Sequence, residues 1–220
     1  MTVNLLLVIM TRLRSKNSGR IGNLLFKNQG ARAWFFLYRK ILCYTKFMKT
    51  FEEIYANHAE MPYISAKYED ELRRKPISKR NMERTREGLL PGHIILLWRI
   101  NFGTYTTYSP HHKYFYTTYG IDAQKELDWL IEHDYLRLMS AKESLIYLRA
   151  DKLKDFLKIK TIKGLSKMKR QGLEQKMLEV YSEDELAPLF ALRGYALTAK
   201  GEEALAAHPE IVRRHPQKKF

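Results

Sequence analysis

The sequence predicts a mainly α-helical protein of the α+β class. Along most of its 220 residues, apolar side chains recur at the three- and four-residue spacing of helix faces. Two short segments, Tyr135–Met139 and Tyr195–Thr198, have the character of strands instead. Hydrophobic residues make up 45% and aromatic residues 12% of the chain, which excludes a wholly disordered protein.

Positive charge is concentrated in two parts of the chain. The formal net charge of +15 indicates a polyanionic partner. Residues 1–47 hold nine Lys and Arg residues and no acidic residue, and residues 142–181 hold eleven basic residues against five acidic ones. The charges of the remaining residues cancel.

Residues 1–47 differ in composition from the rest, and they end where Met48 and the residues after it read like an ordinary protein start. We expect translation to begin at Met48 and residues 1–47 to be a basic leader outside the native protein. The alternative is a basic arm that binds nucleic acid or an acidic membrane surface, with Ala31–Phe47 as a cationic interfacial helix.

No segment is predicted to cross a membrane. Val3–Met10 is too short, and Ala33–Tyr44 is interrupted by Arg39 and Lys40. The single cysteine, Cys43, rules out an internal disulfide and fits a reducing compartment. We therefore expect a cytoplasmic protein without integral membrane association.

Residues 48–87 are predicted to form a charged helical region. Lys67–Arg74 has helical character, and Pro76 ends that helix. Ser78 is the candidate N-cap of a second charged helix that would run to Arg86.

A domain of residues 88–208 is predicted to follow, because Gly and Pro residues mark a boundary at its start. Its first helix begins near Pro91 and is buried, since Ile94–Trp98 is almost continuously apolar. The stretch Phe102–Tyr119 is rich in aromatic residues. We interpret these as core and loop packing; stacking on unpaired bases is the alternative.

An acidic amphipathic helix is predicted over residues 122–134, with Asp122 as its N-cap. Its buried stripe comprises Leu127, Leu130 and Ile131. The segment carries five acidic residues and one basic residue, Lys125, so phosphate repulsion opposes its insertion into a DNA groove. We expect this helix to act as a scaffold or to contact a protein partner.

The C-terminal part is predicted to contain a strand followed by a helix. The strand Tyr195–Thr198 leads into a helix over Ala199–His208, with Thr198 as N-cap. A short acidic helix is expected within Tyr181–Phe190. The basic, polar tail of residues 209–220 is expected to fray.

The strongest functional signal is a pair of short amphipathic segments joined by a basic connector. Leu153–Lys158 and Lys169–Met177 each place their apolar residues on one helical face, and no acidic residue lies between Asp155 and Glu174. Two short helices that share a small core and expose one sign of charge suit polyanion binding; a merely solvated lysine-rich surface is the alternative. The residues predicted to bind nucleic acid are Lys158, Lys160, Lys163, Lys167, Lys169, Arg170 and Lys176.

The same segments carry a recognisable pattern. It consists of Leu153-Lys154-x-x-Leu157, then Gly164-Leu165, then Lys169-Arg170-x-x-Leu173-x-x-Lys176-Met177. This pattern resembles the SAP motif, a two-helix DNA-binding module. The resemblance implies a SAP-like insertion at about residues 148–180 that binds the backbone of double-stranded DNA with little base specificity.

The flanking segments carry a second pattern. Its parts are Leu127-x-x-Leu130 running into Asp134-Tyr135-Leu136, and Tyr195-x-Leu197-Thr198-x-Lys200-Gly201. They resemble winged-helix proteins, which implies a small domain of helices and two strands with the SAP-like pair inserted between the strands. With Pro91–Leu97 and Tyr119–Asp122, the stretch 88–208 is similar to SAP-containing proteins of Gram-positive bacteria and their phages.

These observations favour a non-enzymatic DNA-binding protein with neither cofactor nor metal. The sequence contains none of the Gly-rich phosphate-binding, nucleophile-elbow or zinc-protease motifs, and His111 and His112 lack metal-ligand spacing. The main alternative is a protein-interaction adaptor whose basic patch and acidic helix bind other proteins. A nuclease site assembled from distant residues is a third.

Overall fold

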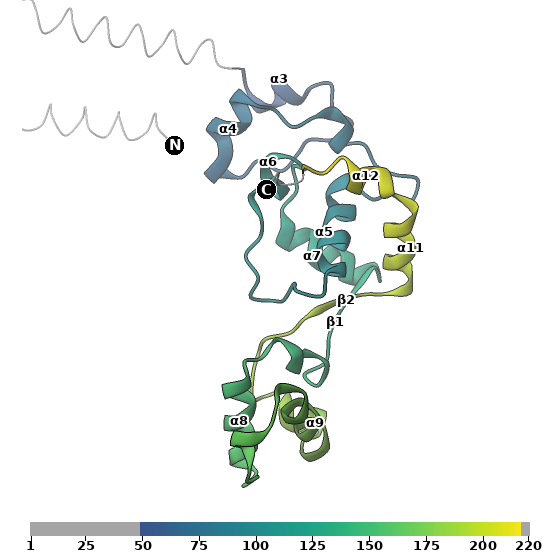
Figure 1. The fold of residues 1–220 in the computed structure, drawn as a ribbon. Helices are drawn as coiled ribbons and strands as arrows, with labels where there is room; N and C mark the ends of the chain where they lie inside the picture. The colour runs from purple at the N-terminus through teal and green to yellow at the C-terminus, as the bar shows by residue number, and fades with distance from the viewer. Residues whose placement is uncertain (1–48, 217–220) are drawn as a thin grey trace, which may run out of the picture. The chain divides into compact units, whose positions relative to one another are not determined.

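The computed structural model describes residues 49–216 (Figure 1). The leader and basic-arm predictions for residues 1–47 lie outside the described residues, as does the end of the tail, residues 217–220. Residues 51–216 belong to one compact unit. Within residues 49–216, no helix is both long and apolar enough to cross a membrane.

The described residues are mainly helical and contain one two-stranded sheet, which confirms the mainly α-helical α+β class. The elements in chain order are α3 (Phe51–Tyr55), the 3₁₀ helix η1 (Ala66–Tyr68), α4 (Glu69–Arg74), η2 (Lys79–Asn81), α5 (Pro91–Asn101), α6 (Lys113–Thr117), α7 (Ala123–Glu132), β1 (Leu136–Leu138), η3 (Glu143–Tyr147), α8 (Ala150–Ile159), η4 (Leu165–Lys167), α9 (Arg170–Val180), α10 (Glu183–Leu186), β2 (Tyr195–Leu197), α11 (Ala199–Ala207) and α12 (Pro209–Arg213).

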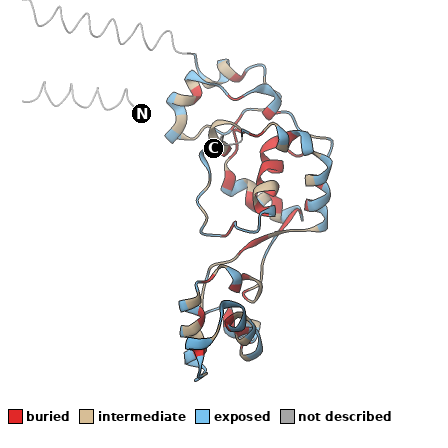
Figure 2. Cartoon of the chain, viewed as in Figure 1, coloured by how far each residue is buried: buried red, intermediate tan, exposed pale blue. Residues whose placement is uncertain are grey.

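One hydrophobic core lies in what we term the main lobe, residues 51–139 and 194–216. It centres on α5, in which every residue from Pro91 to Leu97 is buried (Figure 2). This helix contacts α7, α11, α12 and β2, which explains why its sequence is apolar all round. The buried helix predicted to start near Pro91 is confirmed.

A second core lies in residues 140–193, which we term the helix-pair lobe. This lobe contains η3, α8, η4, α9 and α10, and it is inserted in the chain between β1 and β2 (Figure 1). Its apolar residues cluster separately from those of the main lobe, so each lobe has its own source of stability.

The strands β1 and β2 pair in antiparallel fashion, with Leu136 opposite Leu197. Beyond the last pair, the Met139 N–H donates to the Gly194 carbonyl over 2.9 Å, so the helix-pair lobe begins and ends at neighbouring residues. A Cβ atom at Gly194 would collide with the Tyr147 ring and the Met139 sulfur, so any larger residue there would displace these side chains.

The strand-to-helix transition after β2 follows the prediction. Thr198 is the N-cap of α11, and its hydroxyl accepts a 3.1 Å hydrogen bond from the Gly201 N–H. Gly201 itself has no room for a side chain, because a Cβ atom would overlap the Tyr135 carbonyl oxygen of the chain leading into β1. This contact joins α11 closely to the sheet.

The prediction of a second charged helix from Ser78 to Arg86 is wrong. Only the single 3₁₀ turn η2 forms, and Ser78 makes no side-chain cap. Asn81 and Met82 are both buried, and the Asn81 side-chain amide donates a 2.8 Å hydrogen bond to the distant Thr118 carbonyl. Arg84 also ties the segment to a distant residue through two hydrogen bonds to the Glu60 carboxylate.

The prediction of a frayed tail is wrong for its first residues. Pro209–Arg213 forms α12, Ile211 is buried, and α12 packs against α5. His215 is also buried, with its Nδ1 2.8 Å from the Tyr119 hydroxyl. Contacts with residues far back in the sequence therefore order this segment.

The acidic segments are shorter than predicted. In α7, Leu127 and Leu130 are fully buried as expected, whereas Ile131 is half-buried. Asp122 occupies the N-cap position, but its side chain makes no capping hydrogen bond. Within Tyr181–Phe190, only the four residues of α10 are helical.

Candidate nucleic-acid interface

The predicted helix pair is present as α8 and α9, which pack against each other. In α8, Leu153 and Leu157 are fully buried, one helical turn apart, while its charged residues face outward. In α9, Leu173 and Met177 bury the matching face. The apolar pattern of both segments therefore predicted the packing correctly.

The pair is closed by residues outside the two helices. Leu165, in the connector, is buried between them. Tyr181, just after α9, is also buried, and its hydroxyl donates a 2.7 Å hydrogen bond to the Phe156 carbonyl of α8. This bond fixes the end of α9 against the middle of α8.

The connector between α8 and α9 has a defined backbone conformation. At the end of α8, the Thr161 N–H bonds to the Lys158 carbonyl over 2.8 Å and the Ile162 N–H to the Leu157 carbonyl over 3.1 Å. This is the Schellman arrangement, with Thr161 in the left-handed region at φ 62°. Gly164 is also left-handed, at φ 81°, and starts η4. The connector thus holds its basic residues on an ordered turn.

Four of the seven predicted binding residues are paired with carboxylates. Lys158 lies 3.0 Å from Asp155, and Lys160 lies 2.5 Å from Glu185 of α10. Lys176 lies 2.7 Å from Glu179. The fourth, Arg170, lies 2.7 Å from Glu174 and is considered separately below.

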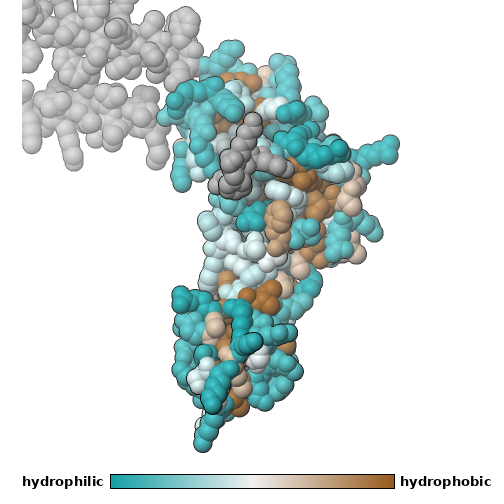
Figure 3. All heavy atoms as spheres, viewed as in Figure 1, coloured by the Kyte–Doolittle hydropathy of each residue, from teal (hydrophilic) through white to brown (hydrophobic). Residues whose placement is uncertain are grey.

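The other three, Lys163, Lys167 and Lys169, are exposed and form no ion pair within residues 49–216. All three belong to the connector, and Lys169 is the N-cap residue of α9. Hydrophilic side chains cover much of the visible face of this lobe (Figure 3). Of the seven predicted binding residues, three therefore have ammonium groups available to a ligand, and four are already paired with carboxylates.

The first turn of α9 adds a further feature of an anion site. It contains no acidic residue, and no side chain caps its backbone N–H groups. Gly172 lies in this turn and is exposed, with open space where a Cβ atom would stand. The backbone there is accessible to an approaching phosphate.

Arg170 has a structural role that its position in a basic run did not reveal. Its guanidinium donates one 2.7 Å hydrogen bond to Glu174 and another to the Ile146 carbonyl of η3. It therefore attaches the start of α9 to the base of the helix-pair lobe. No local spacing predicts this contact, because Ile146 is 24 residues away.

One glutamate that the sequence reasoning passed over, Glu183, attaches α10 to the start of the helix-pair lobe. The Glu183 carboxylate accepts hydrogen bonds from the backbone N–H groups of Ala141 and Lys142, over 2.5 and 3.0 Å. Burial acts against ionisation, but these bonds prevail and lower the pKa of Glu183. A local signal for α10 existed, since Ser182 and Glu185 form a capping box.

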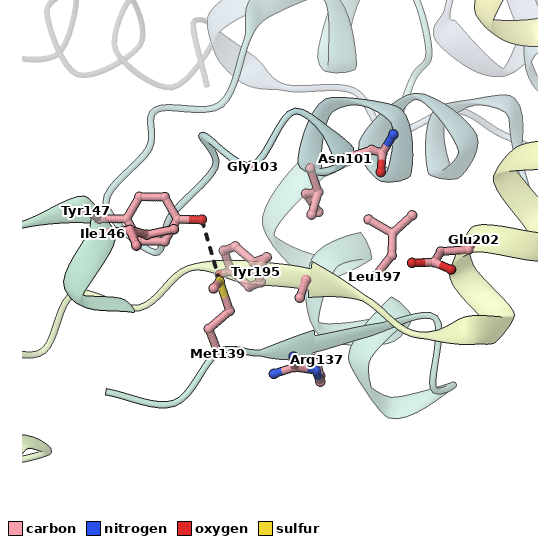
Figure 4. Close-up of a pocket in the computed structure, with 11 residues that line it drawn as sticks. Asn101, Gly103, Arg137, Met139, Ile146, Tyr147, Tyr195, Leu197 and Glu202 are labelled. Atoms are coloured by element: carbon pink, nitrogen blue, oxygen red, sulfur yellow. Dashed lines mark hydrogen bonds between the residues drawn. The ribbon is translucent and has the colours of Figure 1, made fainter. Parts of the chain in front are cut away.

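A shallow groove of about 390 Å³ runs along the sheet, lined in part by Arg137, Met139, Tyr147 and Tyr195 (Figure 4). The Arg137 guanidinium donates two 2.8 Å hydrogen bonds to the Glu143 carboxylate. These bonds lower the pKa of Glu143 to about 2. The pair links β1 to η3 and thus serves the structure. Among residues 49–216, no three His, Cys, Asp or Glu side chains gather as metal ligands would.

The acidic helix α7 uses part of its charge inside the protein. Glu126 lies 2.6 Å from Nε2 of the buried His93, and Asp128 accepts a 3.1 Å hydrogen bond from Gln124. His93 also accepts the Leu90 N–H at Nδ1, so His93 joins the start of α5 to α7. Glu132 remains exposed.

Comparison of the chain with protein-family models, curated proteins and solved structures gives no match. The function is therefore argued from the geometry above.

Proposed function

We propose that this protein binds double-stranded DNA through the connector of the helix-pair lobe, without enzymatic activity and without strong base specificity. The observation that carries the proposal is the exposure of Lys163, Lys167 and Lys169, unpaired, beside the uncapped start of α9. Ammonium groups and free backbone N–H groups are the usual partners of phosphate oxygens. Contacts of this kind carry little sequence information.

The remaining predicted residues rank lower in this proposal. Lys158, Lys160 and Lys176 must exchange a carboxylate for a phosphate, although exposed ion pairs hold them by only about 0.2–1 kcal/mol each. Arg170 acts as a positioning residue, since it holds α9 on η3. The seven residues thus divide into three primary contacts, three secondary ones and one positioning residue.

The order of elements supports a SAP-like and winged-helix-like reading. α7 runs into β1 and β2 runs into α11, as the winged-helix resemblance implies, and Thr106 pairs with Gly194 beside the sheet. The helix pair occupies the connection between the two strands. In this proposal, the cytoplasmic protein of bacterial or phage type presents its DNA contact on the helix pair inserted between the two strands.

The test is fluorescence-anisotropy titration of AT-rich and GC-rich duplexes at about 50 and 200 mM salt. The variant Lys163→Ala/Lys167→Ala/Lys169→Ala should flatten the slope of log affinity against log salt by about 3. The matched control is Lys75→Ala/Lys79→Ala/Arg86→Ala, which removes the same charge from exposed residues of the main lobe. Equal losses in both variants would show that net charge alone drives binding.

The second candidate function is a protein-interaction adaptor. It is favoured by the outward acidic residues of α7 and by Leu138 and Ile146, which are 48% and 52% exposed. Failure of both duplexes to bind at low salt would remove DNA binding and leave this adaptor function. Metal-dependent cleavage of the probe would instead identify a nuclease.

A further inference from the structure

The aromatic stretch Phe102–Tyr119 divides into two groups in the structure. Tyr105, Phe115 and Tyr119 are buried in the main core, as the packing interpretation predicted. Tyr116 is only half-buried, and its ring lies against two tyrosines from an earlier part of the chain. Tyr116 and Tyr68 also pack against the main core, so the packing interpretation accounts for their buried faces but not for the exposed part of the cluster.

Tyr116 forms a surface cluster with Tyr63 and Tyr68. The ring centroids of Tyr63 and Tyr116 are 6.2 Å apart, and those of Tyr68 and Tyr116 are 5.7 Å apart. Tyr63 is 39% exposed. We term this set the tyrosine surface; residues from a loop, η1 and α6 build it, so the fold alone brings them together.

Three lysines surround these rings. The Lys67 ammonium lies 5.4 Å from the Tyr68 centroid, and the Lys125 ammonium lies 6.0 Å from the Tyr63 centroid. Lys113 approaches Tyr68 as well, at 5.6 Å, but it is paired with Glu71 over 2.6 Å. Lys67 and Lys125 form no ion pair in the described part of the chain.

The backbone under the tyrosine surface is held firmly. The Tyr63 N–H donates a 2.7 Å hydrogen bond to the Gly120 carbonyl. Gly120 has φ 61°, and a Cβ atom there would stand 2.5 Å from Cβ of the buried Pro62. The rings therefore stand on a scaffold that needs little ordering when a ligand binds.

The charge of this surface selects the class of ligand. Its own ammonium groups already approach the ring faces, which disfavours a cationic ligand and favours an anionic one. Among the carboxylates near these rings, Glu71 is paired with Lys113, and Asp122 adds to burial in raising the pKa of Tyr116. A ligand with flat rings and spaced phosphates satisfies both features.

We propose that Tyr63, Tyr68 and Tyr116, with Lys67 and Lys125, form a second binding surface whose ligand is single-stranded nucleic acid. Unpaired bases offer their faces for stacking on tyrosine rings, whereas the bases of a duplex are already stacked on one another. The surface lies on the main lobe and shares no residue with the proposed duplex site. It goes beyond the proposed function and does not depend on it.

The test measures binding of a labelled oligothymidylate of about 20 nucleotides, a length that covers one or two typical sites. The starting protein is the Lys163→Ala/Lys167→Ala/Lys169→Ala variant, which removes the duplex contact. Adding Tyr63→Ala should weaken binding about tenfold, and Tyr63→Phe should preserve it, because stacking needs the ring. Adding Lys67→Ala/Lys125→Ala should flatten the salt slope by about 1.4.

The matched control is Tyr108→Ala, since Tyr108 is 69% exposed and lies outside the tyrosine surface. Its removal should leave oligothymidylate affinity unchanged. Equal losses in Tyr63→Ala and Tyr108→Ala, or unchanged affinity in Tyr63→Ala, would overturn the proposal. Thermal melting of each variant verifies folding. Failure of the starting variant to bind oligothymidylate at low salt also overturns it, whatever the duplex result.

Discussion

Thr161 carries the clearest local strain in the helix-pair lobe. It is β-branched and adopts φ 62°, where the Cβ atom crowds the backbone. The conformation persists because Thr161 ends α8 through the two hydrogen bonds that close the Schellman turn. Glycine is the usual residue at such a position, so the threonine costs stability.

Replacing Thr161 by glycine should therefore stabilise the protein. We expect Thr161→Gly to raise the free energy of unfolding by about 0.5–1 kcal/mol, the relief of left-handed strain less the added chain entropy of glycine. Urea denaturation followed by circular dichroism measures this change.

Gly164→Ala provides a control of opposite sign. Gly164 has φ 81° and open space around its Cβ position, so the alanine is strained without a clash and should destabilise by about 1 kcal/mol. Equal effects of the two substitutions would mean that backbone strain does not govern this turn.

At the scale of elements, α12 depends on a buried histidine just beyond its end. The His215 ring lies against Trp98, Tyr114 and Tyr119, and its Nδ1 is 2.8 Å from the Tyr119 hydroxyl. Burial raises the pKa of Tyr119 to about 12, so this hydroxyl stays protonated and is able to donate to Nδ1 when that nitrogen is unprotonated. Burial, with His112 nearby, lowers the pKa of His215.

This arrangement predicts an acid-sensitive attachment of the C-terminal segment. Because the folded-state pKa lies below the unfolded value near 6.5, stability is full above that value and falls as pH drops through the folded-state pKa. His215→Asn keeps an acceptor for Tyr119 but cannot gain the proton. Its melting temperature should fall less than that of the wild type between pH 7.5 and pH 5, and parallel losses would contradict the prediction.

Elements that depend on local contacts can be predicted from the sequence, whereas elements that depend on distant contacts cannot. The helix pair was predictable because Leu153 and Leu157, and Leu173 and Met177, repeat at the spacing of one helix face. That α12 would be an ordered helix was not predictable, because its attachment depends on the contact of His215 with Tyr119, which lies 96 residues earlier. A local pattern carries no record of such a partner.

The candidate site follows the same rule. Composition located the basic connector, but the availability of each charge depends on distant carboxylates. Lys160 is bound by Glu185, 25 residues later, and Arg170 reaches Ile146, 24 residues earlier. The tyrosine surface likewise joins Tyr63 and Tyr68 to Tyr116, which no spacing relates.

At the scale of the whole described chain, the two lobes have separate cores and proposed sites. The helix-pair lobe is flanked by Met139 and Gly194, which are hydrogen-bonded to each other. Residues 140–193 can therefore be replaced by Asn-Gly, the favoured sequence for a two-residue hairpin turn. The Asn-Gly variant, which lacks residues 140–193, should keep a folded main lobe. Dispersed NMR amide signals would show this.

The two proposed activities should separate in this variant. Duplex binding should be lost with the connector, whereas oligothymidylate binding at Tyr63, Tyr68 and Tyr116 should remain. Anisotropy titration with both probes measures the outcome. Retention of duplex binding would place the DNA contact in the main lobe and refute the assignment to the connector.

The insertion between β1 and β2 also bears on the speed of folding. Pairing these strands closes a long loop, and the entropic cost of closure grows with the logarithm of loop length. The contacts between α8 and α9 are local by comparison, so forming the helix pair shortens the effective loop before the strands meet. The Asn-Gly variant makes the hairpin wholly local, and its refolding should be faster than that of the intact chain.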